Sequence, residues 1–412
     1  MRILFVHQNF PGQYLKVVPA LVEHGHEVRA ITRHDNQRPI TVPVDRYEIG
    51  PLQVPGLNPL AGHFHDHVRR GEVVASLASR MRAGGYQPDV ICGHLGWGET
   101  LFLKEIWPAA RMLVHAEFFY GTSGGDVGFD RAIYPIDLAG LMRARSRQAA
   151  LLLAINAADM GQAPTQWQRQ AFPAEIRPKI RVVHEGIDTD VCAPSPSTVI
   201  RLKNGSIVLK PGDEVITFVN RNLEPYRGYH IFMRALPKVL KARPKARAII
   251  VGGNEVSYGG PPPADPATGN RTSWREIFFN EVRDKLDTER VHFVGRIPYD
   301  TFVQLMQVSA VHPYLTYPFV LSWSMLEAMS AGALVIGSRT APVEEVITDG
   351  ETGRLVDFFD PDAWSEAIIE ALAEPQRFRA MREAGRKLVV ERYDLKTVCL
   401  PQQVSLVEQL GR

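Results

Sequence analysis

The sequence predicts an α/β protein built from two doubly wound, parallel-sheet domains. With 412 residues the chain is longer than one ordinary hydrophobic core requires. Short apolar runs alternate with segments of helical periodicity, as in parallel sheets whose strands are joined by helices. A Pro/Ser stretch at residues 194–198 separates two such alternations and is typical of a linker. We therefore expect Rossmann-like domains at 1–193 and 194–394 that face each other across a cleft, with residues 395–412 packed back on the first.

Composition and charge exclude several classes of protein. Hydrophobic residues make up 45% of the chain and charged residues 22%, as in a globular protein. The formal net charge is +2 and there is no long block of Lys or Arg, so no nucleic-acid partner is expected. The three cysteines, Cys92, Cys192 and Cys399, form neither a disulfide framework nor a metal-binding spacing, which favours a cytoplasmic location. No apolar run reaches the length of about eighteen residues that a membrane-spanning helix needs.

The first domain begins with a strand, a helix and a second strand, predicted at 2–6, 14–23 and 26–32. This start lacks the Gly-x-Gly-x-x-Gly fingerprint of a dinucleotide site, which lowers the case for a dehydrogenase. Four more strands are predicted at 89–94, 111–115, 151–156 and 180–184. His94 and His115 end two of these strands, at the edge where a parallel sheet opens to its ligand.

The second domain repeats the alternation. Strands are predicted at 215–219, 246–251, 291–294, 308–313 and 333–337, and helices at 229–240 and 274–286. A further helix opens near Ser324 and contains Glu327 among apolar residues. The Ser-x-x-Glu spacing matches a capping box, while a position at the mouth of the sheet would let the carboxylate accept hydrogen bonds from a ligand. Spacing alone favours the cap, and neighbouring motifs favour the ligand.

Other candidate residues follow strands or open helices. Arg221 and Arg227 lie on a predicted loop before a helix and are suited to a diphosphate, the alternatives being an ion pair with Glu224 and a turn cap. His115 either is satisfied by backbone or hydrogen-bonds a sugar hydroxyl. Gly12 either serves turn chemistry or lets the backbone approach a phosphate or sugar.

Taken in order, these motifs resemble the retaining, nucleotide-sugar-dependent glycosyltransferases of family 4, which have the two-domain GT-B fold. The resemblance covers nearly the whole chain. It rests on the Pro-Gly loop at Gly12, strand-end His115 and five collinear motifs: His184-Glu-Gly-Ile-Asp188, Arg221 to Gly228, Val294-Gly295, Leu326-Glu-Ala-Met-x-x-Gly332 and Thr348-Asp-Gly-x-Thr-Gly353.

The resemblance implies a role for each matching residue. Arg221 stands at the position of the diphosphate-binding arginine, and Arg227 replaces the lysine of a Lys-Gly pair. Glu327 matches the second glutamate of a Glu-x7-Glu motif, which binds the donor ribose. His115 matches the histidine beside the donor sugar, and Gly12 belongs to the N-terminal glycine loop. The backbone of Val320, Leu321 and Ser322 is expected to meet the phosphates and the sugar.

One position departs from the family pattern. Phe319 stands where the first glutamate of the Glu-x7-Glu motif is expected, so the carboxylate that would face the donor sugar is missing. Ser322 and Ser324 nearby offer only neutral hydroxyls. The resemblance suggests front-face attack in which the leaving diphosphate helps to deprotonate the acceptor, so transfer does not require a protein nucleophile.

The sequence thus predicts a cytoplasmic glycosyltransferase that moves a sugar from a nucleoside-diphosphate sugar to a carbohydrate, lipid-linked or other hydroxyl acceptor, for cell-surface polysaccharide or glycoconjugate biosynthesis. Alternatives are a non-catalytic nucleotide-sugar-binding protein and a nucleotide-sugar epimerase of the same fold. No cofactor or metal is expected, because the arginines would offset the diphosphate charge. The basic cluster Arg143–Arg147 favours a solvated helix face, with peripheral contact at the inner face of the membrane as the alternative.

Overall fold

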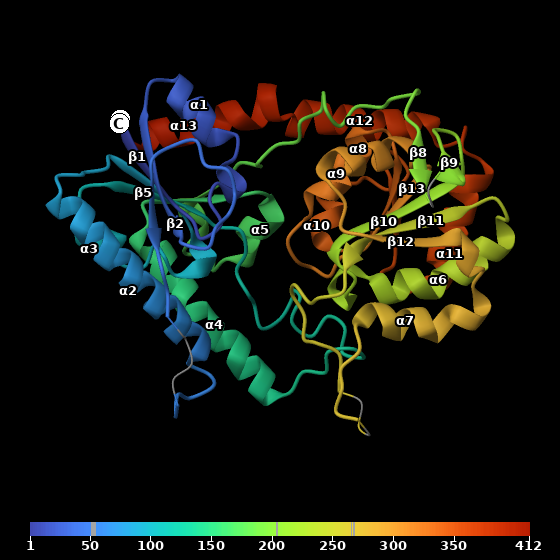
Figure 1. Ribbon diagram of the computed structural model, residues 1–412, viewed down its shortest axis with the longest axis horizontal. Coiled ribbons are helices and arrows are strands. Elements are labelled where there is room, and N and C mark those ends of the chain that lie inside the picture. The colour runs from blue at the N-terminus through green and yellow to red at the C-terminus, as the bar shows by residue number, and fades with distance from the viewer. Residues whose placement is uncertain (51–54, 203–204, 265, 267) are drawn as a thin grey trace. The chain divides into compact units, whose positions relative to one another are not determined.

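The computed structural model describes residues 1–50, 55–202, 205–264, 266 and 268–412. The chain divides into two compact units (Figure 1). Unit 1 contains residues 1–129, 135–186 and 395–412, and unit 2 contains residues 130–134 and 187–394. The main division therefore lies before Ile187, earlier than the expected boundary at 193, and a short segment at 130–134 groups with unit 2.

Unit 1 is built on a seven-stranded sheet in the order β3-β2-β1-β4-β5-β6-β7, with every neighbouring pair parallel. The strands are β1 (Arg2–Val6), β2 (Glu27–Arg33), β3 (Val44–Tyr47), β4 (Val90–His94), β5 (Arg111–His115), β6 (Met160–Ala163) and β7 (Ile180–Val182). The strand order reverses between β1 and β4. In open α/β sheets, ligands bind at the carboxyl ends of the strands beside such a reversal.

Both faces of this sheet are buried, because successive residues of β1 enter different cores. Leu4 and Val6 pack in one core, which includes residues of α2 (Gly62–Ala83), α3 (Leu103–Ile106) and α4 (Leu138–Ala157). Ile3 and Phe5 pack in the other, with residues of α1 (Val17–Glu23) and α13 (Leu400–Leu410) (Figure 1). The last helix of the chain thus completes the core of unit 1. A short helix, α5 (Gln166–Ala171), precedes β7.

Unit 2 contains a six-stranded sheet in the order β12-β11-β10-β13-β14-β15, again parallel throughout. Its strands are β10 (Val215–Asn222), β11 (Arg247–Gly253), β12 (Val291–Gly295), β13 (Val311–Tyr314), β14 (Leu334–Ser338) and β15 (Arg354–Val356). An antiparallel hairpin of β8 (Ile200–Leu202) and β9 (Ile207–Leu209) forms a separate small sheet. The order reverses between β10 and β13, so this sheet has a ligand-binding edge of the same kind.

The helices of unit 2 join these parallel strands. They are α6 (Tyr229–Ala242), α7 (Trp274–Val282), α8 (Tyr299–Val308), α9 (Trp323–Ser330), α10 (Ala341–Glu344), α11 (Pro361–Ala373) and α12 (Arg379–Tyr393). The predicted class, two Rossmann-like parallel-sheet domains, is confirmed.

Two predictions of local structure were wrong. Residues 151–156 are not a strand but lie inside α4, whose buried residues Ala144, Gln148, Leu151 and Ile155 recur at helical spacing. A short apolar run does not by itself distinguish a strand from a buried stretch of helix. Arg221 does not lie on a loop, because β10 continues through Asn222.

Candidate functional site

Arg227 lies at the carboxyl edge of the unit 2 sheet, in the turn Pro225–Arg227 that follows β10. Gly228 ends the turn with φ +66°, and a Cβ at this position would lie 2.2 Å from Cβ of Leu315. Only glycine allows this approach. The backbone of the turn is therefore held close to the loop that follows β13, and the side chain of Arg227 is directed into that loop.

The Arg227 side chain is only 5% exposed and is held by the loop after β13. Its Nη1 donates to Oγ1 of Thr316 at 2.8 Å and to the carbonyl oxygen of Val320 at 3.0 Å. The guanidinium lies 5.1 Å from the ring centroid of Tyr258 and 5.8 Å from that of Phe319. Arg227 thus organises the segment that was predicted to meet the phosphates.

Phe319 occupies the position at which the family pattern has a carboxylate, and it is buried against aromatic rings. Its ring centroid lies 5.7 Å from that of Tyr226 and 4.9 Å from that of Tyr258. A cation over an aromatic face gains electrostatic attraction without a formal charge on the partner. The Phe319 ring therefore forms part of the aromatic surroundings of the Arg227 guanidinium.

Glu224 is fully buried and holds the segment whose Tyr258 ring faces Arg227. Its carboxylate accepts hydrogen bonds from the backbone N–H groups of Ser257, Tyr258 and Gly259, at 3.1 to 3.3 Å. Burial raises the pKa of Glu224, and these hydrogen bonds oppose the rise. Glu224 therefore anchors the segment that contains Tyr258, rather than forming the direct ion pair with an arginine that was considered as an alternative.

Arg221 behaves differently from Arg227. It is exposed near the end of β10, between the partly buried Asn220 and the buried Asn222. The alternation of side chains along a strand directs neighbouring residues to opposite faces. The structure thus packs Arg227, and not Arg221, against the loop that follows β13.

Glu327 lies in α9, which begins after Ser322, and its side chain is 7% exposed. The hydroxyl of Tyr299 donates to its Oε1 at 2.8 Å. Burial raises the pKa of Glu327 to about 7, and the Tyr299 hydrogen bond only partly opposes this. No capping box forms, because the N-cap is Ser322 and no side chain caps the helix start. A carboxylate near neutrality at the mouth of a sheet is characteristic of a functional site.

The backbone segment Val320–Ser322 connects these groups. The N–H of Ser322 donates to the hydroxyl of Tyr314 at 2.8 Å, and Leu321 is buried in the core. The carbonyl of Val320 is already bound to Arg227. The predicted phosphate-facing segment is therefore held by Arg227 and lies immediately before the helix that carries Glu327.

In unit 1 three histidines at the carboxyl edge adopt one local structure. In His7, His94 and His184, Nδ1 accepts the backbone N–H of the residue two positions later, at 3.0, 2.9 and 2.9 Å. A ring nitrogen that accepts a hydrogen bond carries no proton, so each neutral ring carries its proton on Nε2. Burial lowers the pKa of all three histidines and keeps them neutral.

His115 is the exception among these buried histidines. Its Nε2 lies 3.2 Å from Oε1 of Glu185, which follows β7. Burial opposes a charge on His115, but the attraction of Glu185 and Glu117 outweighs it and the pKa is raised. Burial also acts against ionisation of Glu185, yet His115 and His184 lower its pKa to about 2. His115 and Glu185 thus form a buried imidazolium–carboxylate pair.

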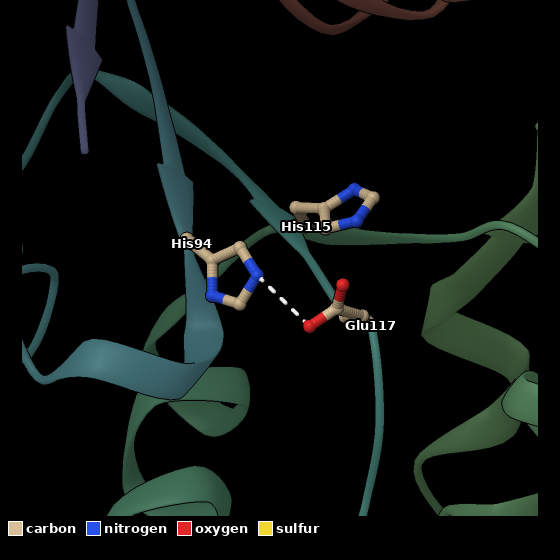
Figure 2. A group of neighbouring side chains, drawn as sticks. All are labelled: His94, His115 and Glu117. Carbon is tan, nitrogen blue, oxygen red and sulfur yellow. Dashed lines mark ion pairs between the residues drawn. The ribbon is translucent and has the colours of Figure 1, made fainter. Parts of the chain in front are cut away.

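His94, His115 and Glu117 form a group that has the residue types of a metal site (Figure 2). Their candidate ligand atoms lie within 4.8 Å of one another, and Nε2 of His94 is 3.6 Å from Oε2 of Glu117. A metal at Nε2 of His94 would require the proton to move to Nδ1, where it would face the N–H of Gly96. It would also compete with Glu185 for His115. The hydrogen bonds therefore favour a proton, rather than a metal ion, between His94 and Glu117.

Gly12 follows the cis peptide bond between Phe10 and Pro11 and has φ +52°. A Cβ at Gly12 would lie 2.8 Å from Cε1 of His7. The glycine is therefore required both by the backbone conformation and by close packing on the His7 ring. Gly12 belongs to the histidine-lined edge of unit 1.

Several residues of these sites were not singled out from the sequence. Glu117 could have been noticed from its spacing, since His115-x-Glu117 places both side chains at one strand end. Tyr299 and Tyr258 lie far along the chain from the residues they contact, and no local pattern marks them.

Comparison with protein families covers most of the chain. Residues 24–192 match the model described as Glycosyl transferase family 4 group, and residues 201–388 match the model described as Glycosyl transferases group 1. The two matches are consecutive and include every site residue discussed above except His7 and Gly12. They fall on the two parallel-sheet units.

Similar proteins are found among characterised enzymes. The chain is 26% identical over 334 residues to the GDP-mannose-dependent alpha-(1-6)-phosphatidylinositol monomannoside mannosyltransferase of Mycolicibacterium smegmatis, covering 78% of each chain. It is 29% identical over 211 residues to a D-inositol 3-phosphate glycosyltransferase of Segniliparus rotundus, covering 50% of this chain and 42% of that protein.

Solved structures share the fold across the whole chain. The Anabaena protein Alr3699/HepE, in complex with UDP and glucose, superposes with a TM-score of 0.67 at 17% identity and 99% coverage of both chains. The sucrose-phosphate synthase of Thermosynechococcus elongatus gives a TM-score of 0.69 at 18% identity, covering 100% of this chain and 99% of that one.

Proposed function

This chain belongs to the family 4 glycosyltransferases of the GT-B fold, and from this premise we propose that it is a retaining enzyme that moves a sugar from a nucleoside-diphosphate sugar to an acceptor hydroxyl. The observation that carries the proposal is Glu327. Its carboxylate is buried, is held by a single neutral hydroxyl and has a pKa of about 7. It lies on the helix that follows the Arg227-bound loop.

The donor would bind along the carboxyl edge of unit 2. Glu327 would accept hydrogen bonds from the ribose hydroxyls, since Tyr299 fills only one of the carboxylate's acceptor positions. The diphosphate would meet the backbone of Val320–Ser322 at the start of α9, where amide groups favour an anion. Arg227 holds this segment in place, and exposed Arg221 is free to move toward a phosphate.

From the resemblance, we propose that His115 lies beside the donor sugar and that Gly12 belongs to the glycine loop of unit 1. In unit 1 the imidazolium of His115 is ion-paired with Glu185, with Nε2 at 3.2 Å from the carboxylate. We infer that His115 acts mainly by orienting and by its charge. The leaving diphosphate would accept the acceptor's proton as the sugar departs, and the new glycosidic bond would form on the same face.

We also propose an acceptor class and a pathway, guided by the relatives. The Mycolicibacterium enzyme acts on a phosphatidylinositol mannoside, and the Segniliparus relative is a D-inositol 3-phosphate glycosyltransferase. A carbohydrate or lipid-linked hydroxyl acceptor, in the synthesis of a cell-surface polysaccharide or glycoconjugate, fits that range. We place this reaction on the cytoplasmic side of the membrane.

Peripheral membrane contact is part of the same proposal. In the described part of the chain, no helix has the length and hydropathy to cross a bilayer. The start of α4, however, exposes Leu138, Leu141 and Met142, next to the exposed Arg143 and Arg145. Apolar and basic groups on one surface helix favour an anionic lipid interface. Sedimentation with vesicles containing anionic lipid, but not with neutral vesicles, is the expected result.

Phe319 supports a second candidate function. A donor site without the expected carboxylate would suit a protein that binds nucleotide sugars without transferring them. Incubation with a panel of nucleoside-diphosphate sugars distinguishes the transferase from the binding protein. Without an acceptor, a transferase slowly hydrolyses its donor and so releases the nucleoside diphosphate. An epimerase would instead change the donor sugar and release no nucleotide.

Arg221→Ala is the sharpest test, since this exposed side chain can be removed without disturbing the core. The panel is first screened by thermal shift, because a ligand that binds the folded state raises its melting temperature. With the donor found, we expect turnover to fall roughly a hundredfold, as when a group that stabilises transition-state charge is removed. Arg201→Ala, on exposed β8, is the matched control.

Wild-type turnover in Arg221→Ala would contradict the diphosphate role of that residue. An NMR spectrum of the product tests the retaining mechanism separately: inversion at the anomeric carbon would overturn it and leave the transferase activity in place.

A further inference from the structure

A cavity lies in unit 2, at the edge of the sheet opposite to Glu327. Its volume is about 420 Å³. It is lined by the turn that enters β10, the end of α8, Ala331 and Gly332 at the end of α9, and one face of α12. Because β10, β13 and β14 begin beside these segments, the cavity lies at the amino edge of the sheet. The proposed donor site occupies the carboxyl edge, so the two sites are separate.

Arg382 supplies an incompletely satisfied cation to this cavity. Its Nε is buried and has no hydrogen-bond partner, and its Nη2 makes a 3.3 Å hydrogen bond to the carbonyl oxygen of Ala310. Burial lowers the pKa of Arg382. In the part of the chain that the structure describes, no carboxylate lies within ion-pair distance of its guanidinium. A partly desolvated charge without a counterion is unfavourable, so an anion at this position would stabilise the fold.

The carboxylates that line the cavity are engaged by other groups. Glu214 accepts two hydrogen bonds from Arg243, at 2.7 and 3.0 Å. Glu383 accepts from Nε of Arg379 at 2.9 Å. Asp213 accepts from the backbone N–H of Lys210 at 2.9 Å. Asp213 keeps its negative charge, because its partner is a neutral N–H. None of the three carboxylates pairs with Arg382, so that guanidinium remains a local excess of positive charge.

A second arginine of α12 adds to this excess and connects the cavity with α9. Arg386 donates to the carbonyl oxygens of Cys192, at 3.1 Å, and of Ser330, the last residue of α9. Both partners are uncharged, so the guanidinium keeps its full positive charge. A cation at the carboxyl end of a helix also interacts favourably with the helix dipole. The cavity therefore adjoins the carboxyl end of α9, the helix that carries Glu327.

The remaining lining is partly apolar. Pro194, Val308 and Leu372 contribute to it, together with small residues at the end of α9. A concave site of several hundred cubic ångströms that combines apolar walls with a few polar groups is typical for a small ligand. A guanidinium is suited to an oxygen anion, because its donors lie in one plane.

We propose that this cavity is a second ligand site, which binds a small phosphorylated compound with its phosphate on Arg382 and its carbon skeleton against Pro194 and Leu372. A ligand there contacts the end of α9 and strengthens the packing between α9 and α12. It would thereby bias the position of Glu327, so the donor affinity would depend on occupancy of the cavity. This last step rests on the proposed function, whereas binding at the cavity does not.

Isothermal titration of the full chain with glucose 6-phosphate tests the binding, with inorganic phosphate and glucose as the two partial ligands. We expect glucose 6-phosphate to bind more tightly than phosphate and glucose not to bind. Arg382→Met retains most of the side-chain volume and removes the charge, so the affinity should fall roughly tenfold to a hundredfold. Lys387→Met, on the exposed side of the same helix, outside the cavity lining and paired with Glu391, is the matched control.

Two further variants keep the test decisive. Ser195→Trp fills the cavity from the segment after β7 and should abolish binding if Arg382→Met fails to fold. Glu327→Gln alters the opposite edge and should change the affinity for glucose 6-phosphate far less than Arg382→Met, because it acts only through the coupling between the two edges. The proposal is overturned if no phosphorylated probe binds. It is equally overturned if Glu327→Gln removes binding while Arg382→Met and Ser195→Trp do not, because the phosphate would then occupy the donor edge.

Discussion

Glu185 and Glu327 are buried glutamates near the carboxyl edges of the two parallel sheets, and they are held in opposite charge states. Glu185 contacts His115 and His184, and its pKa is lowered to about 2. Glu327 contacts the neutral hydroxyl of Tyr299, and its pKa is raised to about 7. Burial acts in the same direction on both, so the charge of the partner decides the outcome.

The difference suggests how each edge is prepared for its ligand. In unit 1 the imidazolium and the carboxylate are already paired, so the edge is charged but internally compensated. In unit 2 the Glu327 carboxyl group, with its pKa of about 7, is partly protonated at neutral pH. Hydrogen-bond donors from a ligand would stabilise its ionised form. Hydroxyl groups of a ribose are donors of this kind, which agrees with the proposed donor site.

The largest expected effect concerns Glu185→Gln. This change leaves buried His115 without its carboxylate, and breaking a buried pair by removing one partner costs about 3–5 kcal/mol. The pKa of His115 should also fall, because burial then dominates. Urea unfolding at pH 7 measures the first effect, and an NMR titration of His115 measures the second.

Glu117→Gln is the control within the same edge. The Glu117 side chain is 35% exposed and lies 3.6 Å from His94, so we expect a loss of at most about 1 kcal/mol. If both variants lost the same free energy of unfolding, the His115–Glu185 pair would stabilise the fold no more than the exposed Glu117 does.

The next effect concerns the pH dependence of stability. The folded-state pKa of Glu327 is about 7, above its ordinary value of 4.5, so the folded state binds more protons than the unfolded state between these values. Stability from this group is therefore greatest at low pH and is lost as pH rises from about 4.5 to 7, by about 3 kcal/mol in total.

Urea unfolding of the wild type and of Glu327→Gln across this pH range checks the expectation. Gln cannot ionise. As the pH rises, the free energy of unfolding of the wild type should therefore fall more than that of Glu327→Gln. A constant difference from pH 4.5 to 8 would mean that Glu327 has an ordinary pKa.

A smaller effect is expected at Gly12. An alanine at a positive φ costs about 1–2 kcal/mol. Gly12→Ala has a further cost, because its Cβ would contact the His7 ring. Gly25→Ala is the matched control, because Gly25 has φ +82° with no heavy atom near the added Cβ. Thermal melting should show a larger loss for Gly12→Ala. Equal losses would argue against close packing of Gly12 on His7.

The smallest effect is expected from zinc. Because the hydrogen bond from Gly96 to Nδ1 of His94 keeps the ring proton on Nε2, an equimolar amount of Zn²⁺ should leave the melting temperature unchanged. A rise that disappears in His94→Ala would instead assign a metal site to His94, His115 and Glu117.

Local patterns in the sequence were sufficient for the alternation of strands and helices, the two-domain class and the strand-end position of His115. Each of these depends on residues close together along the chain, where periodicity acts. The same local reasoning was wrong for residues 151–156, since an apolar run looks alike in a strand and in a buried helix. It also placed Arg221 on a loop, because the register of β10 depends on its neighbours in the sheet.

By itself, the sequence determined which residues were available at the two edges, including Glu327, Arg227 and the unusual Phe319. Only the tertiary structure decided their states: Arg227 became buried against Tyr258, Glu327 received a neutral partner, and His115 received a charged one. The reason is that a pKa and a side-chain orientation depend on burial and on the nearest partner, and those partners come from distant parts of the chain.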